Sequence, residues 1–216
     1  MASLNQLAYN IARTLGKQED EAMIEKLRTQ IVMARAMLIR QSYERHNVMV
    51  EQFVQDLDCV TLEEAKMTEC CNVTIPGCTV RRTPELPVPI TLQRNVYFKY
   101  VGGTDKVHEL SYIFPESIDD LAYLRYAGPW RWYTYLDNRI FTITKQSPGK
   151  LINIRGVFEN PRAAAKFVNC SGQPCYTDDD DFPISGAMEQ MVTDILLKQE
   201  GRFIQLINGI EVQTDD

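Results

Sequence analysis

The residues with the clearest capacity for chemistry are six cysteines, of which four fall within residues 59–78. Thiolates bind soft metal ions, so this cluster could hold Zn²⁺. The spacing argues against it, because two of the thiols are adjacent and no paired C-x2-C pattern occurs. We predict no metal site, and reduced thiols buried in strands. The residues concerned are Cys59, Cys70, Cys71, Cys78, Cys170 and Cys175.

Groups for acid–base or nucleophilic catalysis are sparse. The two histidines, His46 and His108, fall at the end of an expected helix and in an expected strand, which leaves little material for a general base. The Gly-x-Ser-x-Gly, His-Glu-x-x-His and phosphate-loop motifs are missing from the sequence. The acidic pairs 63–64 and 119–120 are sequence neighbours and therefore point in different directions. We expect no catalytic residues, no cofactor and no enzymatic activity.

Two further runs of residues could bind ligands. Four consecutive aspartates at 178–181 lack the alternating spacers of a calcium loop, so we expect a solvated loop. The aromatic run from Trp130 to Tyr135 could line a pocket that stacks sugars or bases. Its alternation in a strand is explained more simply by one face in the core and the other at an interface. A small α+β ligand-binding domain or enzyme with this aromatic pocket is the alternative hypothesis.

Helices are expected at the start of the chain. Ser3 and Gln6 form a capping-box pattern, apolar residues recur at helical spacing from Leu4 to Leu15, and Gly16 fits the end of that helix. A second helix is predicted from Glu19 to Asn47, because this stretch is free of Gly and Pro and its apolar residues recur at helical spacing. Its length is roughly 40 Å at 1.5 Å per residue.

The second helix has more apolar surface than one packed face needs. Ile24, Leu27 and Ile31 fall on one stripe, and Met33 and Met37 widen it. Such a helix packs on more than one side. It is either a central core helix or part of a subunit interface, and both can hold on different faces. We assign a lateral subunit interface to five residues: Ile31, Met33, Met37, Trp130 and Trp132.

The middle of the chain has the patterns of β-structure. Strands are expected at 59–62, 79–81, 88–92 and 150–158. Residues 96–101 and 107–112 predict a hairpin with a Gly-rich turn, and residues 130–136 and 139–144 predict a second hairpin through Asp137-Asn138. Short helices are expected over 115–126 and, after Asn160-Pro161, over 162–168.

The last part of the chain returns to helical patterns. Ser185 is expected to cap a helix that continues through Leu197 and ends at Gly201. The apolar segment after it either docks on a partner or forms a last strand of the chain's own sheet. On the docking interpretation, five residues contact a partner protein: Phe203, Ile204, Leu206, Ile207 and Ile210.

Charge and hydropathy exclude several functional classes. Residues 1–169 are close to neutral, whereas residues 170–216 hold ten acidic and two basic residues. This acidity disfavours a nucleic-acid binder and fits a surface that meets a basic protein or a channel in which DNA must not adhere. No apolar run reaches the roughly 18 residues that span a bilayer. Without a secretion signal, we expect no membrane and synthesis in the cytosol.

Three segments together resemble a known family. They are Ile31-Val32-Met33-Ala34-Arg35-Ala36-Met37-Leu38 in the second helix, Arg155-Gly156-Val157-Phe158-Glu159-Asn160-Pro161, and the closing helix around Met188 to Leu197. In this order they resemble the head-to-tail adaptor, or tail tubular ring protein, of short-tailed bacteriophages. The layout is most similar to a ring protein of crAss-like phages.

The resemblance implies an α+β fold in which N-terminal and C-terminal helices form a bundle with an inserted β-rich layer. The bundle would comprise residues 1–57 and 183–216, and the insertion residues 58–182. The resemblance also implies a structural virion protein of the tail or neck, assembled in the cytoplasm of the bacterial host. Twelve subunits would form a ring that docks under the portal, meets the next tail ring or tail protein, and passes DNA without binding it specifically. The five apolar residues of the C-terminal segment would then contact the portal or another axial partner.

Overall fold

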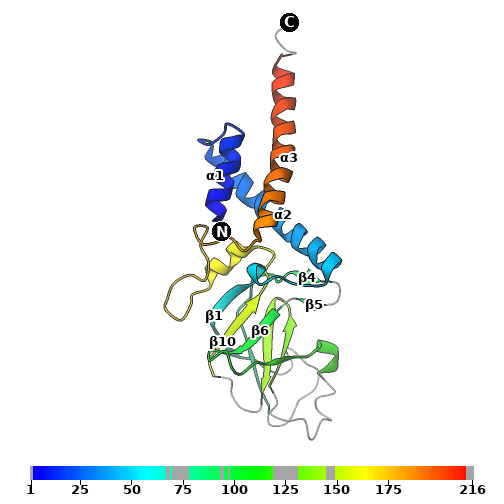
Figure 1. The fold of residues 1–216 in the computed structure, drawn as a ribbon. Coiled ribbons are helices and arrows are strands. Elements are labelled where there is room, and N and C mark those ends of the chain that lie inside the picture. Colours follow the sequence, from blue (N-terminus) through cyan, green and yellow to red (C-terminus); the bar gives the residue numbers. More distant parts are fainter. Residues whose placement is uncertain are drawn as a thin grey trace. The chain divides into compact units, whose positions relative to one another are not determined.

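The computed structural model describes residues 2–66, 69, 78–92, 95, 96, 98–118, 131–144 and 149–212 (Figure 1). For residues 95, 96 and 203–212 it describes the backbone. The chain divides into two compact units. The helical unit contains Met1–Phe53, Glu159–Arg162 and Tyr176–Asp216, and the sheet unit contains Val54–Phe158 and Ala163–Cys175. Helices at both ends and sheets between them confirm the predicted α+β class.

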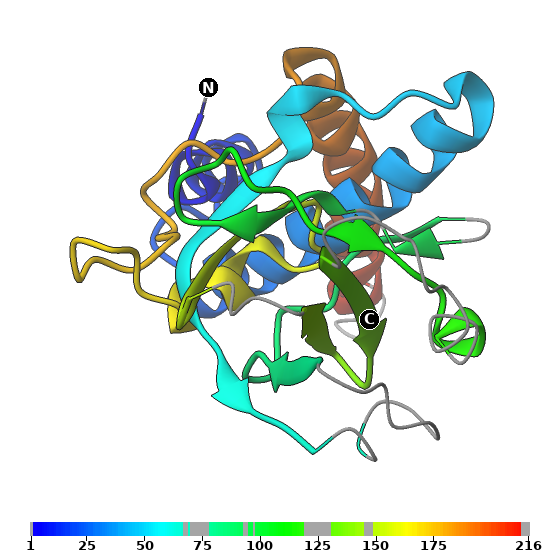
Figure 2. The ribbon, with the colours of Figure 1, turned by 90° about the horizontal axis from the view of Figure 1, so that it is seen from below.

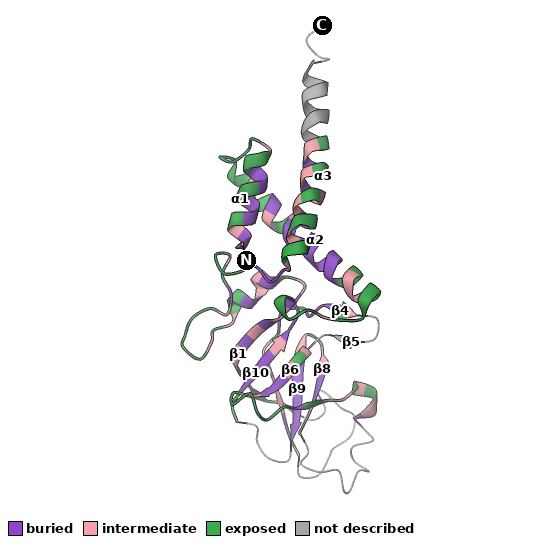
Figure 3. Cartoon of the chain, viewed as in Figure 1, coloured by how far each residue is buried: buried purple, intermediate pink, exposed green. Residues whose placement is uncertain are grey.

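The helical unit begins with the predicted capping box. In helix α1 (Leu4–Thr14) the Ser3 hydroxyl accepts a hydrogen bond from the Gln6 amide, and the Gln6 side chain accepts one from the Ser3 amide, both at 3.2 Å. These bonds satisfy amides that the first helical turn leaves free. One face of α1 is buried (Figure 3). Its buried residues are Leu4, Leu7, Ala8, Ile11 and Ala12.

Helix α2 (Glu21–His46) confirms the predicted long helix with slightly shorter bounds. It begins where the Asp20 carboxylate accepts the Met23 amide at 3.0 Å, and it ends at Asn47, whose φ of 52° is left-handed. A turn of 3-10 helix, η1 (Glu51–Phe53), follows. Figure 3 shows the buried stripe along α2. The buried residues are Leu27, Ile31, Val32, Ala34, Arg35, Ala36, Leu38 and Ile39.

Helix α3 (Gly186–Val212) is longer than the sequence predicted. The expected end at Gly201 is wrong, because the helix continues through this glycine, and the alternative of a closing strand is wrong as well. A glycine inside a helix costs about 1 kcal/mol relative to alanine, which packing around it can offset. The preceding residue, Glu200, is buried against α2 and holds the helix at this point.

The side chain of Arg35 is the most unusual group in the core of the helical unit. It is fully buried, and its Nε donates to the carbonyl oxygen of Pro183 at 2.6 Å. Its terminal nitrogen donates to the carbonyl oxygen of Phe53 at 3.1 Å, and the guanidinium lies 5.8 Å from the ring centre of Phe182. Burial lowers the pKa of Arg35 to about 9, since the charged form loses water. Arg35 thus joins α2 to two distant chain segments.

We expect Arg35→Met to lower the free energy of unfolding by about 2–4 kcal/mol. Methionine fills a similar volume but removes the donor on which the carbonyl oxygens of Pro183 and Phe53 depend. Arg45→Met, at an exposed position of the same helix, should change stability by about 0.5 kcal/mol or less. Denaturant titration followed by the far-ultraviolet signal of the helices measures both. Equal stability of the two variants would contradict the role assigned to Arg35.

Helix α3 is attached to α2 by a second polar contact. The buried carboxylate of Glu200 accepts hydrogen bonds from Lys26 Nζ at 2.8 Å and from Gln30 Nε2 at 2.7 Å. Burial acts to raise the pKa of Glu200, but the hydrogen bonds from Lys26 and Gln30 outweigh it, so the pKa lies below its usual value. The ionised form of Glu200 therefore stabilises the contact between α2 and α3.

This shift predicts a pH-dependent contribution to stability. Because the pKa is lower in the folded state, the stabilisation is present above the unfolded pKa and is lost as pH falls through the folded value. We expect Glu200→Gln to be about 1–2 kcal/mol less stable than the parent at neutral pH, with the difference shrinking on acidification. Thermal unfolding across this pH range is the measurement, with Asp194→Asn at an exposed position of α3 as control. A difference that is constant with pH would exclude the titration of Glu200.

Among the described residues, the sheet unit contains short strands in three sheets, and all but one of the strand pairs are antiparallel. The sheet orders are β1-β10-β6, β2-β3-β9-β8-β7 and β4-β5, and Figure 2 shows the first of these sheets from below. The strands are β1 (Gln55–Thr61), β2 (Glu63–Glu64), β3 (Thr79–Arg82), β4 (Thr91–Leu92), β5 (Asn95–Val96), β6 (Phe98–Gly103), β7 (Ser111–Tyr112), β8 (Arg131–Leu136), β9 (Arg139–Thr144) and β10 (Leu151–Gly156). The 3-10 helix η3 (Pro115–Ser117) lies between β7 and β8 in the sequence, and the 3-10 helix η5 (Pro161–Lys166) follows β10.

The hairpin predicted through Asp137-Asn138 is confirmed. β8 and β9 pair antiparallel from Arg131↔Thr144 to Leu136↔Arg139. Both turn residues have positive φ, 49° and 57°, as a two-residue type I′ turn requires. The predicted strand over 150–158 is also confirmed as β10. The apolar side chains of β9 pack with Val80 and Ile118 in a buried cluster.

The hairpin predicted from residues 96–112 is confirmed next to its turn and not over its whole length. β6 pairs with β10, and β7 pairs in parallel with β8, so the two segments belong to different sheets. Next to the turn they pair antiparallel at the bridge Gly102↔Glu109. There the Gly103 amide donates to the carbonyl oxygen of His108 at 2.9 Å, and the Leu110 amide donates to that of Val101 at 2.8 Å. The loop between them is organised locally by Asp105, whose carboxylate accepts the amides of Val107 and His108. The local pairing that the Gly-rich turn predicted is thus present next to the turn, and β6 and β7 also pair over long range with β10 and β8.

The predicted short helices differ in type. Pro115–Ser117 forms a turn of 3-10 helix, and residues 119–126 lie outside the described residues. Pro161–Lys166 is also 3-10 helix, with the Asn160 side chain accepting the Arg162 amide at 3.0 Å. The cap at Asn160-Pro161 was therefore placed correctly, whereas the helix type was not.

The expectation of reduced thiols is contradicted at two positions. Cys59 and Cys170 form a disulfide between residues 111 positions apart, with their Cα atoms separated by 5.2 Å. The sequence offered no sign of this pairing, because only the folded sheet unit brings the two residues together. Cys175 is a free thiol, Cys78 and Cys175 are both half-buried, and Cys70 and Cys71 lie outside the described residues.

Candidate assembly surface

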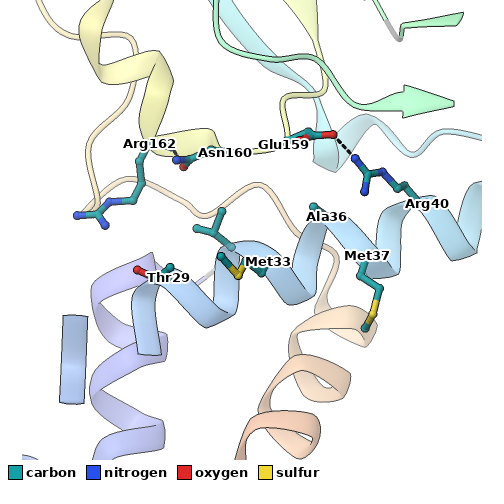
Figure 4. Close-up of a pocket in the computed structure, with 9 residues that line it drawn as sticks. Thr29, Met33, Ala36, Met37, Arg40, Glu159, Asn160 and Arg162 are labelled. Carbon is teal, nitrogen blue, oxygen red and sulfur yellow. Dashed lines mark hydrogen bonds and ion pairs between the residues drawn. The ribbon is translucent and has the colours of Figure 1, made fainter. Parts of the chain in front are cut away.

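The helical unit has an open groove along α2. Its volume is about 380 Å³, and Figure 4 shows the side chains that line it. One wall is a single face of α2 and the other is the segment of residues 159–162. The lining residues are Thr29, Val32, Met33, Ala36, Met37, Arg40, Glu159, Asn160 and Arg162. We call this feature the α2 groove.

The middle of the α2 groove is apolar. Val32 and Ala36 are buried, whereas Met33 is 67% exposed and Met37 is 43% exposed. These residues recur at spacings of three and four, so they lie on neighbouring turns of one helix face. Methionine side chains are flexible and polarisable, which suits them to contacts with a partner surface. Two such side chains exposed beside buried neighbours point to a surface that is covered in an assembly.

Ion pairs close both ends of the α2 groove. Arg40 pairs with Glu159 at one end, as the dashed line in Figure 4 marks. At the other end Arg162 pairs with Glu25 at 2.7 Å and with Asp178 at 3.0 Å. Hydrogen bonds from Arg162 and then Arg28 lower the pKa of Glu25, and the bond to Glu25 raises the pKa of Arg162. The charges thus fix the segment of residues 159–162 against α2 and frame the apolar middle.

The five residues predicted for a lateral interface differ in their surroundings. Met33 and Met37 line the α2 groove. Ile31 is fully buried within the protomer, so its assignment to an interface is corrected: it is a core residue. Trp132 belongs to the sheet unit, where it packs against the buried cluster of Val80 and Phe141, and Trp130 lies outside the described residues.

The five residues predicted for axial docking all fall on the last part of α3. Positions 203, 206, 207 and 210 continue the helical stripe occupied earlier by the buried Met188, Val192 and Leu196. Figure 1 shows this part of α3 continuing past α1 and α2 within the helical unit. An apolar stripe is therefore carried on a helical extension, which we call the distal α3 segment (residues 203–212).

The aromatic strand has its neighbours within the sheet unit. The ring of Phe98 lies 6.3 Å from that of Tyr133 and 5.4 Å from that of Tyr135, and Tyr112 lies 5.4 Å from Tyr133. Burial raises the pKa of Tyr133 well above its usual value. These edge-to-face contacts engage the rings with one another. The aromatic-pocket hypothesis gains no support from them.

Comparison with known families identifies this kind of protein. The family described as phage tail ring protein 2 matches residues 6–210. The chain belongs to this family. It is thus a ring protein of crAss-like phages and a structural component of the phage tail, as the sequence resemblance implied. No curated protein matches the chain.

Across the part of the chain that the structure describes, no group of three or more His, Cys, Asp or Glu residues could hold a metal ion. Within the same residues, no helix is long and apolar enough to cross a membrane. The segment of residues 159–162, with its ion pairs, was missed as part of a site. Its only signal in the sequence was its place in one of the segments that resemble the family.

Proposed function

We propose that this ring protein is the subunit of a head-to-tail connector. Twelve copies form a ring that docks under the portal and continues the DNA channel into the tail. The ring is assembled in the cytoplasm of the bacterial host and becomes part of the neck of the virion. Membership of a tail ring family supports the ring, and the two surfaces described above support its contacts.

The observation that carries the proposal is the presence of two unlike apolar surfaces on one helical unit. A closed ring requires heterologous contacts, in which one surface of a subunit meets a different surface of the next. A stack of rings requires a further surface along the axis. The α2 groove and the distal α3 segment differ in shape, since one is a groove and the other a helical extension.

We assign the α2 groove to the lateral contact with a second copy. Its apolar middle and charged ends match the usual arrangement of interfaces, an apolar centre with a polar rim. Met33 and Met37 contribute the exposed apolar surface, and Arg40–Glu159 forms part of the rim. In this assignment the neighbouring subunit covers the two methionines. Ile31, which is buried in the core of the helical unit, holds α2 in position.

We expect Met33→Glu to abolish ring formation without unfolding the subunit. The new carboxylate would be buried against apolar surface on assembly, which is unfavourable by several kcal/mol. Ala22→Glu adds the same charge at an exposed position of α2 outside the groove and should leave rings intact. Native mass spectrometry of the ring, with portal added if the ring requires it, distinguishes the two. Ring formation by the Met33→Glu variant would show that the α2 groove is not the lateral contact.

We assign the distal α3 segment to docking on the portal. Its apolar stripe suits insertion of a helix face into a groove, with anchors repeated every three or four residues. The acidity of residues 170–216 also suits a surface beside a DNA channel, because like charges keep DNA from adhering. The ring would thus pass DNA without specific binding and present its opposite side to the next tail ring or tail protein.

A matched pair of substitutions tests the portal contact. Ile207→Glu places a charge in the stripe, whereas Gln205→Glu places the same charge on the opposite side of the helix. We expect the first to weaken binding to the portal of the same phage at least roughly 100-fold, about 2.7 kcal/mol, and the second to change it little. Titration of labelled portal gives both values. Deletion of residues 202–216 should reproduce the loss, and portal binding by the truncated subunit would refute the assignment.

A further inference from the structure

The disulfide between Cys59 and Cys170 has no part in the contacts proposed above. Both cysteines belong to the sheet unit, Cys59 on β1 and Cys170 in the loop of residues 167–175. Cys170 is exposed and Cys59 is half-buried. A hollow of about 500 Å³ lies beside Cys59, lined in part by Val60 and Phe167. Small redox reagents can therefore reach the bond from solvent.

A bulge in β1 places Cys59 for this bond. The register between β1 and β10 shifts between Leu57 and Val60, and Cys59 has a φ of 57°, in the left-handed region that residues other than glycine rarely occupy. Its amide donates to the side-chain oxygen of Asn153 at 2.9 Å, and Asn153 is buried on β10. The bulge is thus held by a hydrogen bond that does not depend on the state of the thiol.

The loop that carries Cys170 is also closed by its own hydrogen bonds. The Cys175 amide donates to the carbonyl oxygen of Phe167 at 2.8 Å, and the Asn169 amide donates to that of Gln173 at 2.7 Å. The Asn169 side chain accepts the amides of Ser171 and Gln173. Both halves of the site are therefore formed by non-covalent contacts, and two reduced thiols would remain within bonding reach.

We propose that Cys59 and Cys170 form a redox-controlled staple that is open during synthesis and closed in the released particle. The proposal rests on the proposed virion role, because the bacterial cytoplasm keeps thiols reduced and the surroundings of a released particle do not. Closure fixes the loop of residues 167–175 to β1. The bond joins residues near the two ends of the sheet unit, which begins at Val54 and ends at Cys175.

The chemistry is a thiol–disulfide exchange with a small disulfide such as oxidised glutathione. The exposed Cys170 thiolate attacks one glutathione sulfur, and the first reduced glutathione leaves. The Cys59 thiolate then attacks Cys170 Sγ in the mixed disulfide and releases the second reduced glutathione. Two protons leave the protein, and its two electrons reduce the glutathione disulfide. Burial raises the pKa of Cys175, so this nearby thiol competes poorly as the attacking group.

Peptide mapping and hydrogen exchange on the full-length chain test the staple. In a glutathione buffer made oxidising after full reduction, we expect the Cys59–Cys170 peptide pair to be the main linked species. Amide exchange in residues 167–175 should slow roughly tenfold or more. Cys175→Ser should keep both results, and Cys170→Ser, at an exposed position, should lose both. A different partner for Cys59, or equal exchange in the Cys170 variant and the oxidised parent, would overturn the staple.

The timing is tested on the phage itself. Infected cells are lysed into a thiol-alkylating reagent, and released particles are treated in the same way. Alkylated Cys59 and Cys170 in cells, and the linked pair in particles, would support the switch. The linked pair in both samples, or alkylated thiols in both, would refute it. The peptide-mapping experiment uses the purified chain alone and needs neither portal nor ring. Its result therefore does not depend on whether the protein is a connector subunit, and the two proposals can fail separately.

Discussion

The helical unit depends on one buried cation. Its chain is interrupted, because it leaves for the sheet unit after Phe53 and resumes its main part at Tyr176. Arg35 binds the carbonyl oxygen of Phe53 on one side of this interruption and that of Pro183 on the other. A guanidinium presents donors in a fixed planar fork, so one side chain can hold both ends where an apolar residue could not. The insertion of a sheet unit is compatible with a continuous helical core for this reason.

This arrangement explains why apolar surface remains on α2. The face of α2 that includes Leu27, Arg35 and Ile39 is buried within the helical unit. The face with Met33 and Met37 is bounded by the short segment of residues 159–162, which ion pairs hold at each end of the groove. Salt bridges at exposed positions contribute little stability individually, but here they set the shape of a surface. The groove is therefore a built feature of the helical unit, and this fits the lateral contact that we propose.

Local patterns in the sequence predicted local structure well. The capping box at Ser3, the long helix from Glu21 and the turn at Asp137-Asn138 each follow from interactions between near neighbours. The errors occurred where distant segments compete with such signals. β6 pairs with β10 along its length and with the following segment only next to the turn, and α3 continues through Gly201.

The same distinction applies to the candidate surface. Met33 and Met37 were recognisable because they widen a helical stripe, but helical periodicity alone did not separate them from the buried Ile31. The other wall of the groove, and the pairing of Cys59 with Cys170, depend on contacts between residues more than a hundred positions apart. Such contacts leave no periodic pattern in the sequence, so the groove and the disulfide could be seen only in the structure.

The position of the disulfide has a mechanical consequence. Tension between the helical parts of the chain reaches the sheet unit at Val54 and at Cys175, each five residues from a bonded cysteine. With the bond closed, the load between these points passes through the sulfur atoms, and most strands of the sheet unit lie outside its path. If the subunit lines the DNA channel as proposed, force on it would extend only residues 54–59 and 170–175 before the covalent link carries the load.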